Sequence, residues 1–271
     1  MKRVYLDNAA TTPLDAEVIA EMTNVMQNFY GNPSAIHALG REVRTLVEKA
    51  RKTVSGLLNA SPSEIFFTSG GTEADNTAIR CGISAYGIKH AITSKIEHHA
   101  VEHTLGMLLK DGVIDKLSFV NIDEKGKIDY NHLEELLQNN ERSFVSLMHA
   151  NNELGTLTDM ETVGDICEKY NAIYHADTVQ TMGHYPHDVR KLKAHFIVCA
   201  AHKLHGPKGV GFLYVNSNIK IPPMIYGGAQ ERNMRGGTEN VYGIVGLAKA
   251  LEIAYKEMDE HQSYIQGLKI I

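Results

Sequence analysis

Short apolar runs alternate with longer amphipathic stretches along most of this chain. Runs of four to seven residues without proline, bounded by polar or turn residues, are typical of buried strands. Stretches whose apolar residues recur every three or four positions are typical of helices that cover a sheet. The pattern predicts strands at 64–68, 90–94, 117–120, 143–149, 172–176, 196–200 and 210–215, and helices at 35–58, 72–86, 98–109, 130–138 and 160–170.

Seven strands interleaved with helices predict a three-layer α/β/α fold around a mostly parallel sheet. The chain has no internal repeat, low-complexity tract or Pro/Ser-rich linker, so we expect one large domain. In such sheets the loops at the carboxyl ends of the strands collect the chemistry. The side chains that directly follow each strand are therefore the first candidates for a functional site.

Composition and charge give no support for a nucleic-acid partner or a membrane span. The 271 residues carry a net charge of −5, which gives no reason to expect a nucleic-acid partner. The amino terminus lacks the apolar run of a signal peptide, and no window approaches the roughly 18 apolar residues of a membrane span, so we expect a cytoplasmic protein without a membrane partner. Cys81, Cys167 and Cys199 show no CxxC spacing, which predicts buried, reduced thiols.

The segment EIFFTSGGTEADN places Gly71 and Thr72 between a predicted strand and the first turn of a predicted helix. Free backbone N–H groups and the positive end of the helix dipole favour a phosphate there, glycine allows close approach, and Thr72 offers a hydroxyl. The same residues also make an ordinary turn and N-cap, so the segment alone does not decide between these interpretations.

Two charged side chains follow later predicted strands. Asp177 ends AIYHAD, where a buried carboxylate needs a partner such as a protonated pyridine nitrogen; capping of a following helix is the alternative. Lys203 follows HFIVCAAH, where desolvation lowers the pKa of an amine and suits it to form a Schiff base. Lys208 competes for that role, but its Gly-Pro-Lys-Gly turn favours a solvent-exposed side chain.

His98 and Asn152 follow two more predicted strands. His98 is suited to stack on a flat heteroaromatic ring or to move protons above it, and Asn152 to donate to a ring oxygen. Each is alternatively a hydrogen-bonded scaffold residue. The functional interpretation of His98 and Asn152 depends on the other candidate residues. A phosphate-binding turn, two ring contacts, a carboxylate and a lysine together fit pyridoxal 5'-phosphate (PLP).

Eight blocks occur in order along the chain: YLDNAATTP, GNPSAIHALG, FTSGGTEADN, SKIEHHAV, HANNELG, YHADTVQTMG, AHKLHGPKGVG and RGGTENV. Together they resemble the class V aminotransferase group of fold type I PLP enzymes, and specifically its cysteine desulfurases. The resemblance implies a PLP-binding large domain at 16–255 and an N-terminal segment, 1–15, that contributes to the active site. It also implies that 256–271 begin a helix leading to a small domain that is absent here.

The resemblance also implies roles for individual residues. At the phosphate it places Gly71, Thr72 and His202, and in a homodimer Thr238 reaches the phosphate of the partner subunit. Around the ring it places His98 as a stacking and catalytic residue, Asn152 and Gln180 at the ring oxygen, Asp177 at the pyridine nitrogen and Lys203 as the Schiff-base lysine.

The activity implied by the resemblance is conversion of L-cysteine to L-alanine, with the sulfur left as an enzyme-bound persulfide for iron–sulfur cluster or thio-cofactor assembly on an acceptor scaffold protein. Two departures from the family bear on this. Ala200 stands where relatives have a phosphate-binding serine, and relatives continue into a small domain with the sulfur-accepting cysteine and a carboxylate-binding arginine. We therefore expect the chain to be inactive or incomplete alone. Either it is a fragment or split subunit that needs a second chain to supply the small domain, or it is a stand-alone PLP-binding protein with little desulfurase activity.

Three alternatives stay open. The chain could catalyse another class V aminotransferase or lyase reaction, or be a non-catalytic PLP-binding protein. Separately, His99-Ala-Val-Glu102-His103 matches the H-x-x-E-H pattern of inverted zinc peptidases, although no third ligand is evident in the sequence.

Overall fold

A seven-stranded sheet forms the centre of the computed structural model, which describes residues 4–138 and 142–268. Its strands lie in the order β1-β7-β6-β5-β4-β2-β3. Six of them run parallel, and β7 is antiparallel to both of its neighbours. The strands are β1 (Ile65–Thr68), β2 (His90–Thr93), β3 (Lys116–Phe119), β4 (Ser143–Ser146), β5 (Ile173–Asp177), β6 (Phe196–Ala200) and β7 (Gly211–Val215).

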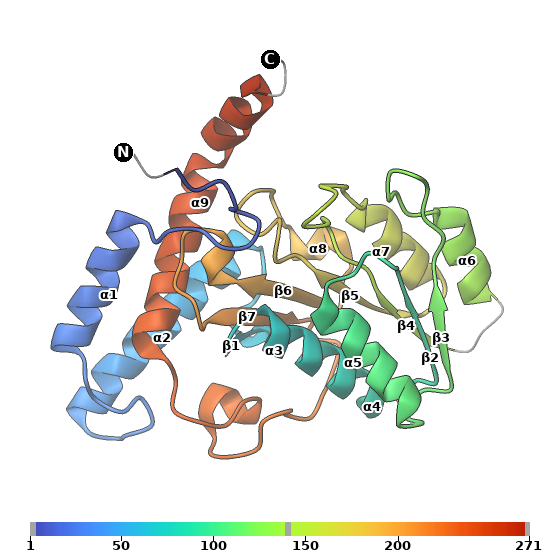
Figure 1. Ribbon diagram of the computed structural model, residues 1–271. Coiled ribbons are helices and arrows are strands. Elements are labelled where there is room, and N and C mark those ends of the chain that lie inside the picture. The colour runs from blue at the N-terminus through green and yellow to red at the C-terminus, as the bar shows by residue number, and fades with distance from the viewer. Residues whose placement is uncertain (1–3, 139–141, 269–271) are drawn as a thin grey trace.

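Helices cover both faces of this sheet, so the three-layer α/β/α prediction is confirmed (Figure 1). One layer contains α3 (Gly71–Asn76), a π-helical turn η2 (Thr77–Cys81), α4 (Gly82–Ala85) and α5 (His99–Lys110). The other contains α1 (Ala16–Asn28), α2 (Ala38–Leu57), α6 (Tyr130–Gln138), α7 (Met160–Lys169), α8 (Val189–Leu192) and α9 (Val241–Leu268). Short 3-10 turns lie at η1 (Pro62–Glu64), η3 (Ala201–Lys203) and η4 (Gln230–Asn233).

Two buried apolar clusters hold the layers together, because each sheet face is apolar and packs against its own helices. Ile79, Ile83 and Phe144 belong to the cluster under α3–α5, and Val54 and Leu251 to the cluster under α2 and α9. All five side chains are fully buried.

The predicted elements differ from the structure in details. The helix predicted at 72–86 is one continuous helical run over 71–85, but it contains the π turn η2. Residue 256, where we expected a helix to begin, lies inside α9, which begins at Val241; residues 1–3 and 269–271 of the expected terminal segments lie outside the described residues.

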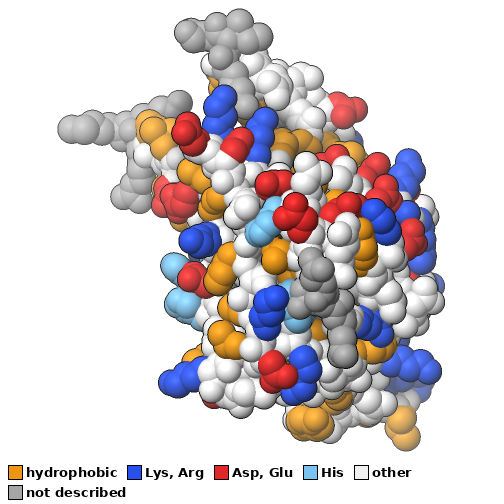
Figure 2. Space-filling view, turned by 90° about the vertical axis from the view of Figure 1, so that its right-hand side faces the viewer, with side chains coloured by type: hydrophobic (Ala, Val, Ile, Leu, Met, Phe, Trp, Pro, Cys, Tyr) orange, Lys and Arg blue, Asp and Glu red, His pale blue; other side chains and the backbone are white. Residues whose placement is uncertain are grey.

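The face on the side of α6 and β3 carries acidic and basic side chains interspersed with one another (Figure 2). None of the helices in the described part of the chain is long and apolar enough to cross a membrane.

Candidate active site

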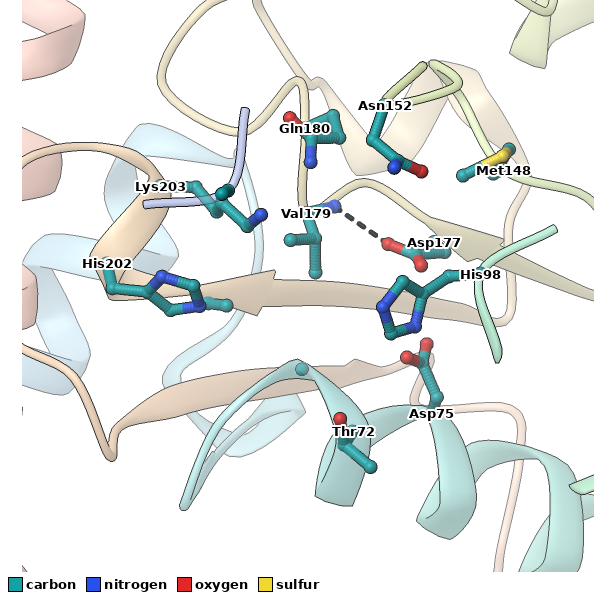
Figure 3. A pocket seen from close by; sticks show the side chains of 13 residues that line it. Thr72, Asp75, His98, Met148, Asn152, Asp177, Val179, Gln180, His202 and Lys203 are labelled. Atoms are coloured by element: carbon teal, nitrogen blue, oxygen red, sulfur yellow. Dashed lines mark hydrogen bonds between the residues drawn. The ribbon is translucent and has the colours of Figure 1, made fainter. Parts of the chain in front are cut away.

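The loops after β1, β2, β4, β5 and β6 meet around one cavity of about 240 Å³ at the carboxyl edge of the parallel strands (Figure 3). Eight of the nine predicted site residues line it, and Thr238 does not. The lining residues are Ala10, Gly71, Thr72, Asp75, His98, Met148, Asn152, Asp177, Val179, Gln180, Ala200, His202 and Lys203.

The amino end of α3 forms one wall of the cavity. Gly70 there has a φ of 148°, a conformation that side chains other than glycine rarely adopt. A Cβ atom on Gly71 would lie 2.8 Å from Cγ2 of Val179, so this position has no room for a side chain. Gly71 and Thr72 both line the cavity, so this helix N-terminus faces it, and helix N-termini favour anions.

Asp177, the last residue of β5, is the carboxylate on the opposite side of the cavity (Figure 3). Its side chain is only 5% exposed, and its Oδ1 accepts a hydrogen bond of 2.9 Å from the backbone N–H of Val179. Burial, helped by the nearby carboxyl of Asp75, raises the pKa of Asp177 to about 7. A cationic donor in the cavity would stabilise the ionised form of this carboxylate.

Asp75 and His175 form a buried pair beside Asp177 that the sequence analysis missed. Asp75 Oδ1 lies 3.3 Å from His175 Nε2, and neither atom has a hydrogen bond to any other described residue. Burial raises the pKa of Asp75 to about 8 and lowers the pKa of His175 to about 4, so the pair favours its uncharged form. His175 Nδ1 lies 2.8 Å from the hydroxyl of Ser146, which fixes the ring.

Glu97 is a third buried carboxyl near the cavity. Its Oε1 accepts hydrogen bonds from Ser94 Oγ (2.7 Å) and the backbone N–H of Met148 (3.1 Å), which tie the β2 and β4 loops together. Burial raises the pKa of Glu97 to about 8. A signal for Glu97 and Asp75 exists in the sequence, since each lies within four residues of a predicted site residue, but their burial follows only from the packing of several strands.

Lys203 enters the cavity from η3 (Figure 3). Burial lowers the pKa of its amine, although Asp177 and Asp7 act in the opposite direction. A lowered pKa increases the fraction of uncharged, nucleophilic amine. Lys208, the competing lysine, is exposed and does not line the cavity.

The N-terminal segment closes the side of the cavity near Lys203. The carbonyl of Ala9 accepts hydrogen bonds from Lys203 Nζ and from Gln180 Nε2. The backbone N–H and the hydroxyl of Thr12 both donate to the carbonyl of His202 at 2.9 Å. These contacts place Ala10 in the lining of the cavity.

His98, Asn152 and His202 complete the polar lining. His98 is the N-cap of α5, and its Nδ1 accepts a 3.1 Å hydrogen bond from the backbone N–H of Ala100, which leaves Nε2 for the cavity. Asn152 donates to its neighbour Glu153 at 2.8 Å. Burial, with the charges of two nearby lysines, lowers the pKa of His202, so its ring is neutral near pH 7.

Thr238 lies in a second, smaller cavity of about 80 Å³ with Ser69 and Arg235. The loop that carries Thr238 is joined to α3 by an ion pair in which Arg235 Nε lies 3.0 Å from Oε1 of Glu73. Thr238 therefore lines a cavity different from the one that the other eight predicted residues share.

All three cysteines are buried and free. Burial raises the pKa of Cys81, Cys167 and Cys199, which disfavours the nucleophilic thiolate. The expectation of buried thiols is confirmed, and none of the three is paired in a disulfide.

Comparison with known proteins identifies the family. The model of the class V aminotransferases (Aminotransferase class-V) matches residues 4–269, and the chain belongs to this family. Within the family the chain is cysteine desulfurase-like. It is 46% identical to the cysteine desulfurase IscS of Dictyoglomus turgidum over 99% of this chain and 68% of that protein. The family depends on PLP in general.

Solved structures agree with this assignment. A structure described as a NifS-like protein superposes with a TM-score of 0.95 at 42% identity, over 99% of this chain and 74% of that one. A structure described as SspA in complex with cysteine gives a TM-score of 0.87 at 34% identity, over 92% of this chain and 72% of that one. The fold type I prediction is thereby confirmed.

Proposed function

We propose that this chain binds PLP covalently through Lys203 and L-cysteine next to it, as the cofactor-binding part of a cysteine desulfurase. The observation that carries this proposal is the convergence of five strand ends, with Asp177, Lys203 and the α3 amino end, on one cavity. The relatives named as cysteine desulfurases and the cysteine-bound SspA structure support the choice of substrate.

The residues around the cavity fit PLP. Gly71, Thr72 and the ring of His202 offer N–H and O–H donors for a phosphate, and all three residues line the cavity. The buried carboxyl of Asp177 would gain a cationic hydrogen-bond donor from a protonated ring nitrogen. When bound, PLP supplies an electrophilic carbon and a ring that withdraws electrons from the substrate.

Each polar group then has a distinct task. The Lys203 amine, with its pKa lowered by burial, is suited to attach the cofactor and to exchange a proton with the substrate. His98 presents Nε2 from a fixed position at the amino end of α5, where it can stack on the ring and move a proton. Asn152 and Gln180 offer amide donors for the ring oxygen.

Sulfur transfer needs a thiolate at the substrate sulfur. Since Cys81, Cys167 and Cys199 are buried and none of them lines the cavity, we propose that a second chain supplies this thiol, and that the sulfur passes to an acceptor protein. We also propose a homodimer, in which Thr238 faces the phosphate of the partner subunit. Analytical ultracentrifugation of the PLP-loaded chain measures its oligomeric state, and a monomer at micromolar concentration would contradict the proposed homodimer.

Substrate choice is tested by titrating gel-filtered, PLP-loaded protein with amino acids while its absorbance spectrum is recorded. L-Cysteine is expected to change the cofactor band at lower concentration than L-serine, which has the same shape with a hydroxyl. A chain that responds to another amino acid and not to cysteine would instead belong to a different class V reaction. A chain that holds PLP but responds to none would be a non-catalytic binder.

A further inference from the structure

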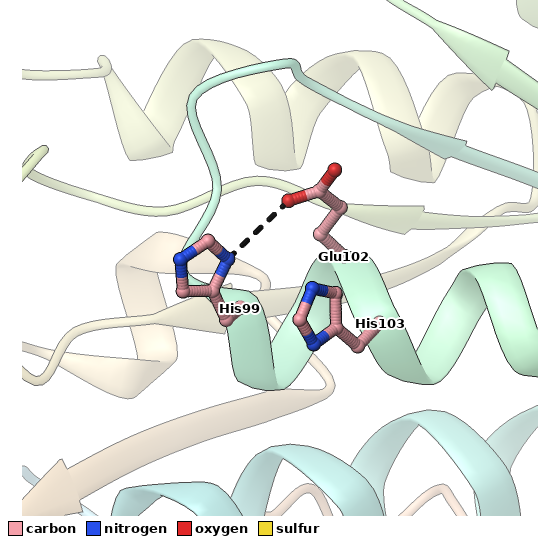
Figure 4. A group of neighbouring side chains, drawn as sticks. All are labelled: His99, Glu102 and His103. Atoms are coloured by element: carbon pink, nitrogen blue, oxygen red, sulfur yellow. Dashed lines mark ion pairs between the residues drawn. The ribbon is translucent and has the colours of Figure 1, made fainter.

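Three side chains with metal-binding atoms lie together on the outer face of α5 (Figure 4). They are His99, Glu102 and His103, and one ligand atom from each lies within 4.8 Å of the others. His99 Nδ1 is 3.6 Å from Glu102 Oε2. The two imidazole rings are stacked, with 4.9 Å between their centroids and 21° between their planes.

Helix geometry explains why these three meet. Residues three and four positions apart lie on the same face of a helix, so His99 is a neighbour of both Glu102 and His103. Two histidines at i and i+4 with a carboxylate between them are a recurrent metal-binding arrangement on helices. The family assignment replaces the peptidase alternative for this motif, and the proposed PLP chemistry uses none of the three side chains.

The group can contract around an ion. Zinc–nitrogen and zinc–oxygen distances of about 2.0–2.2 Å require ligand atoms roughly 3.3 Å apart in a tetrahedral site. The side chains of His99 and Glu102 are 77% and 51% exposed, so rotation about their side-chain bonds meets little resistance. Solvent at this exposed face supplies the remaining ligand positions.

Charge and ligand type select the class of ion. The positive end of the α5 dipole and the nearby Arg80, which lines the same shallow depression, both oppose a cation. The negative charge of Glu102 offsets only part of this electrostatic repulsion. Mg²⁺ and Ca²⁺, which prefer several oxygen ligands, are therefore disfavoured, whereas Zn²⁺, Ni²⁺ and Cu²⁺ gain strong bonds to imidazole nitrogen.

We propose that His99, Glu102 and His103 form a surface binding site for a divalent transition-metal ion of the zinc class. The site borders the cofactor cavity, because His98 and Thr72 line both that cavity and the depression that contains His99 and His103. Since His98 is the N-cap of α5, an ion on the first turn of α5 immobilises the helix end that positions His98. This proposal does not depend on the assignment of Lys203 or of PLP.

The test is a zinc titration of the 271-residue chain without a histidine tag, in competition with a chromophoric zinc indicator. One high-affinity zinc ion per chain is expected, Ni²⁺ should displace it, and a thousandfold excess of Mg²⁺ should not. His103→Asn should weaken zinc binding at least tenfold, with an unchanged circular dichroism spectrum.

His261→Asn is the matched control, because His261 is also exposed and lies 3.6 Å from the carboxylate of Glu257, but among the described residues it belongs to no group of three close metal-binding side chains. Its zinc affinity should equal that of the unsubstituted chain. The absence of a high-affinity zinc ion, or equal affinity in His103→Asn and the unsubstituted chain, would overturn the proposal.

Discussion

Replacing Asp177 by asparagine should stabilise the cofactor-free protein and at the same time weaken PLP binding. The pKa of about 7 in the folded state lies about three above the 3.8 of a free aspartate. At about 1.4 kcal/mol per pKa unit, ionising this buried carboxyl costs roughly 4 kcal/mol of stability at pH 8. Asparagine has the same shape, retains the acceptor for the Val179 N–H, and carries no charge.

The direction of the pH dependence follows from the raised pKa. The folded state holds the Asp177 proton more tightly than the unfolded chain, so stability is full below about pH 4 and is lost as the pH rises toward 7. The advantage of Asp177→Asn should therefore grow by about 2.5 kcal/mol between pH 5 and pH 8. Urea unfolding of the cofactor-free proteins at both pH values measures it.

Asp123 offers a control of opposite sign. This exposed carboxylate accepts backbone hydrogen bonds from Lys127 and Lys125, which lower its pKa, so Asp123→Asn should give no gain at pH 8. The reasoning makes two claims: ionised Asp177 destabilises the cofactor-free protein, and it stabilises bound PLP. If Asp177→Asn is no more stable than the unsubstituted protein at pH 8, or binds PLP equally well, the reasoning is refuted.

Three further substitutions test the cavity and its support. Ala200→Ser adds a hydroxyl beside the phosphate seat and should tighten PLP binding about three- to tenfold by fluorescence titration; unchanged affinity would show that the hydroxyl does not reach the phosphate. Gly71→Ala puts a Cβ atom 2.8 Å from Val179 and should weaken PLP binding at least about tenfold, with recovery in a double variant that also carries Val179→Ala. Arg51 is 2% exposed and pairs with Glu231 at 2.7 Å, so Arg51→Met should lower the free energy of unfolding in urea by about 3–5 kcal/mol, and a loss under about 1 kcal/mol would contradict this.

Periodicity and apolar runs were sufficient to predict all seven strands and the three-layer arrangement, because most of the strands are buried and read as short apolar runs between helical patterns. The direction of β7 was not predictable in this way, since an apolar run reads the same in either direction. The π turn at Thr77–Cys81 also lacks a local signal, and so the helix pattern was predicted without interruption.

Site residues were predictable where they lie at the carboxyl end of a strand or a few residues beyond it, as Asp177, His98 and Lys203 do. Asp75 and His175 were not, because their pairing depends on how α3 packs against β5, and neither residue is unusual in its own segment. Thr238 is a different case. The family resemblance suggested it, and its position outside the main cavity of one subunit agrees with a role across a dimer interface, which stays a prediction.

The central claim is that Lys203 forms the covalent bond to PLP, and borohydride reduction followed by peptide mass spectrometry tests it most directly. The account predicts an absorbance band near about 400 nm that borohydride removes, with the pyridoxyl mass on the peptide that contains Lys203. Lys203→Ala should lose the band, and Lys208→Ala should keep it. A pyridoxyl group on another lysine, or an intact reducible band in Lys203→Ala, would contradict the account.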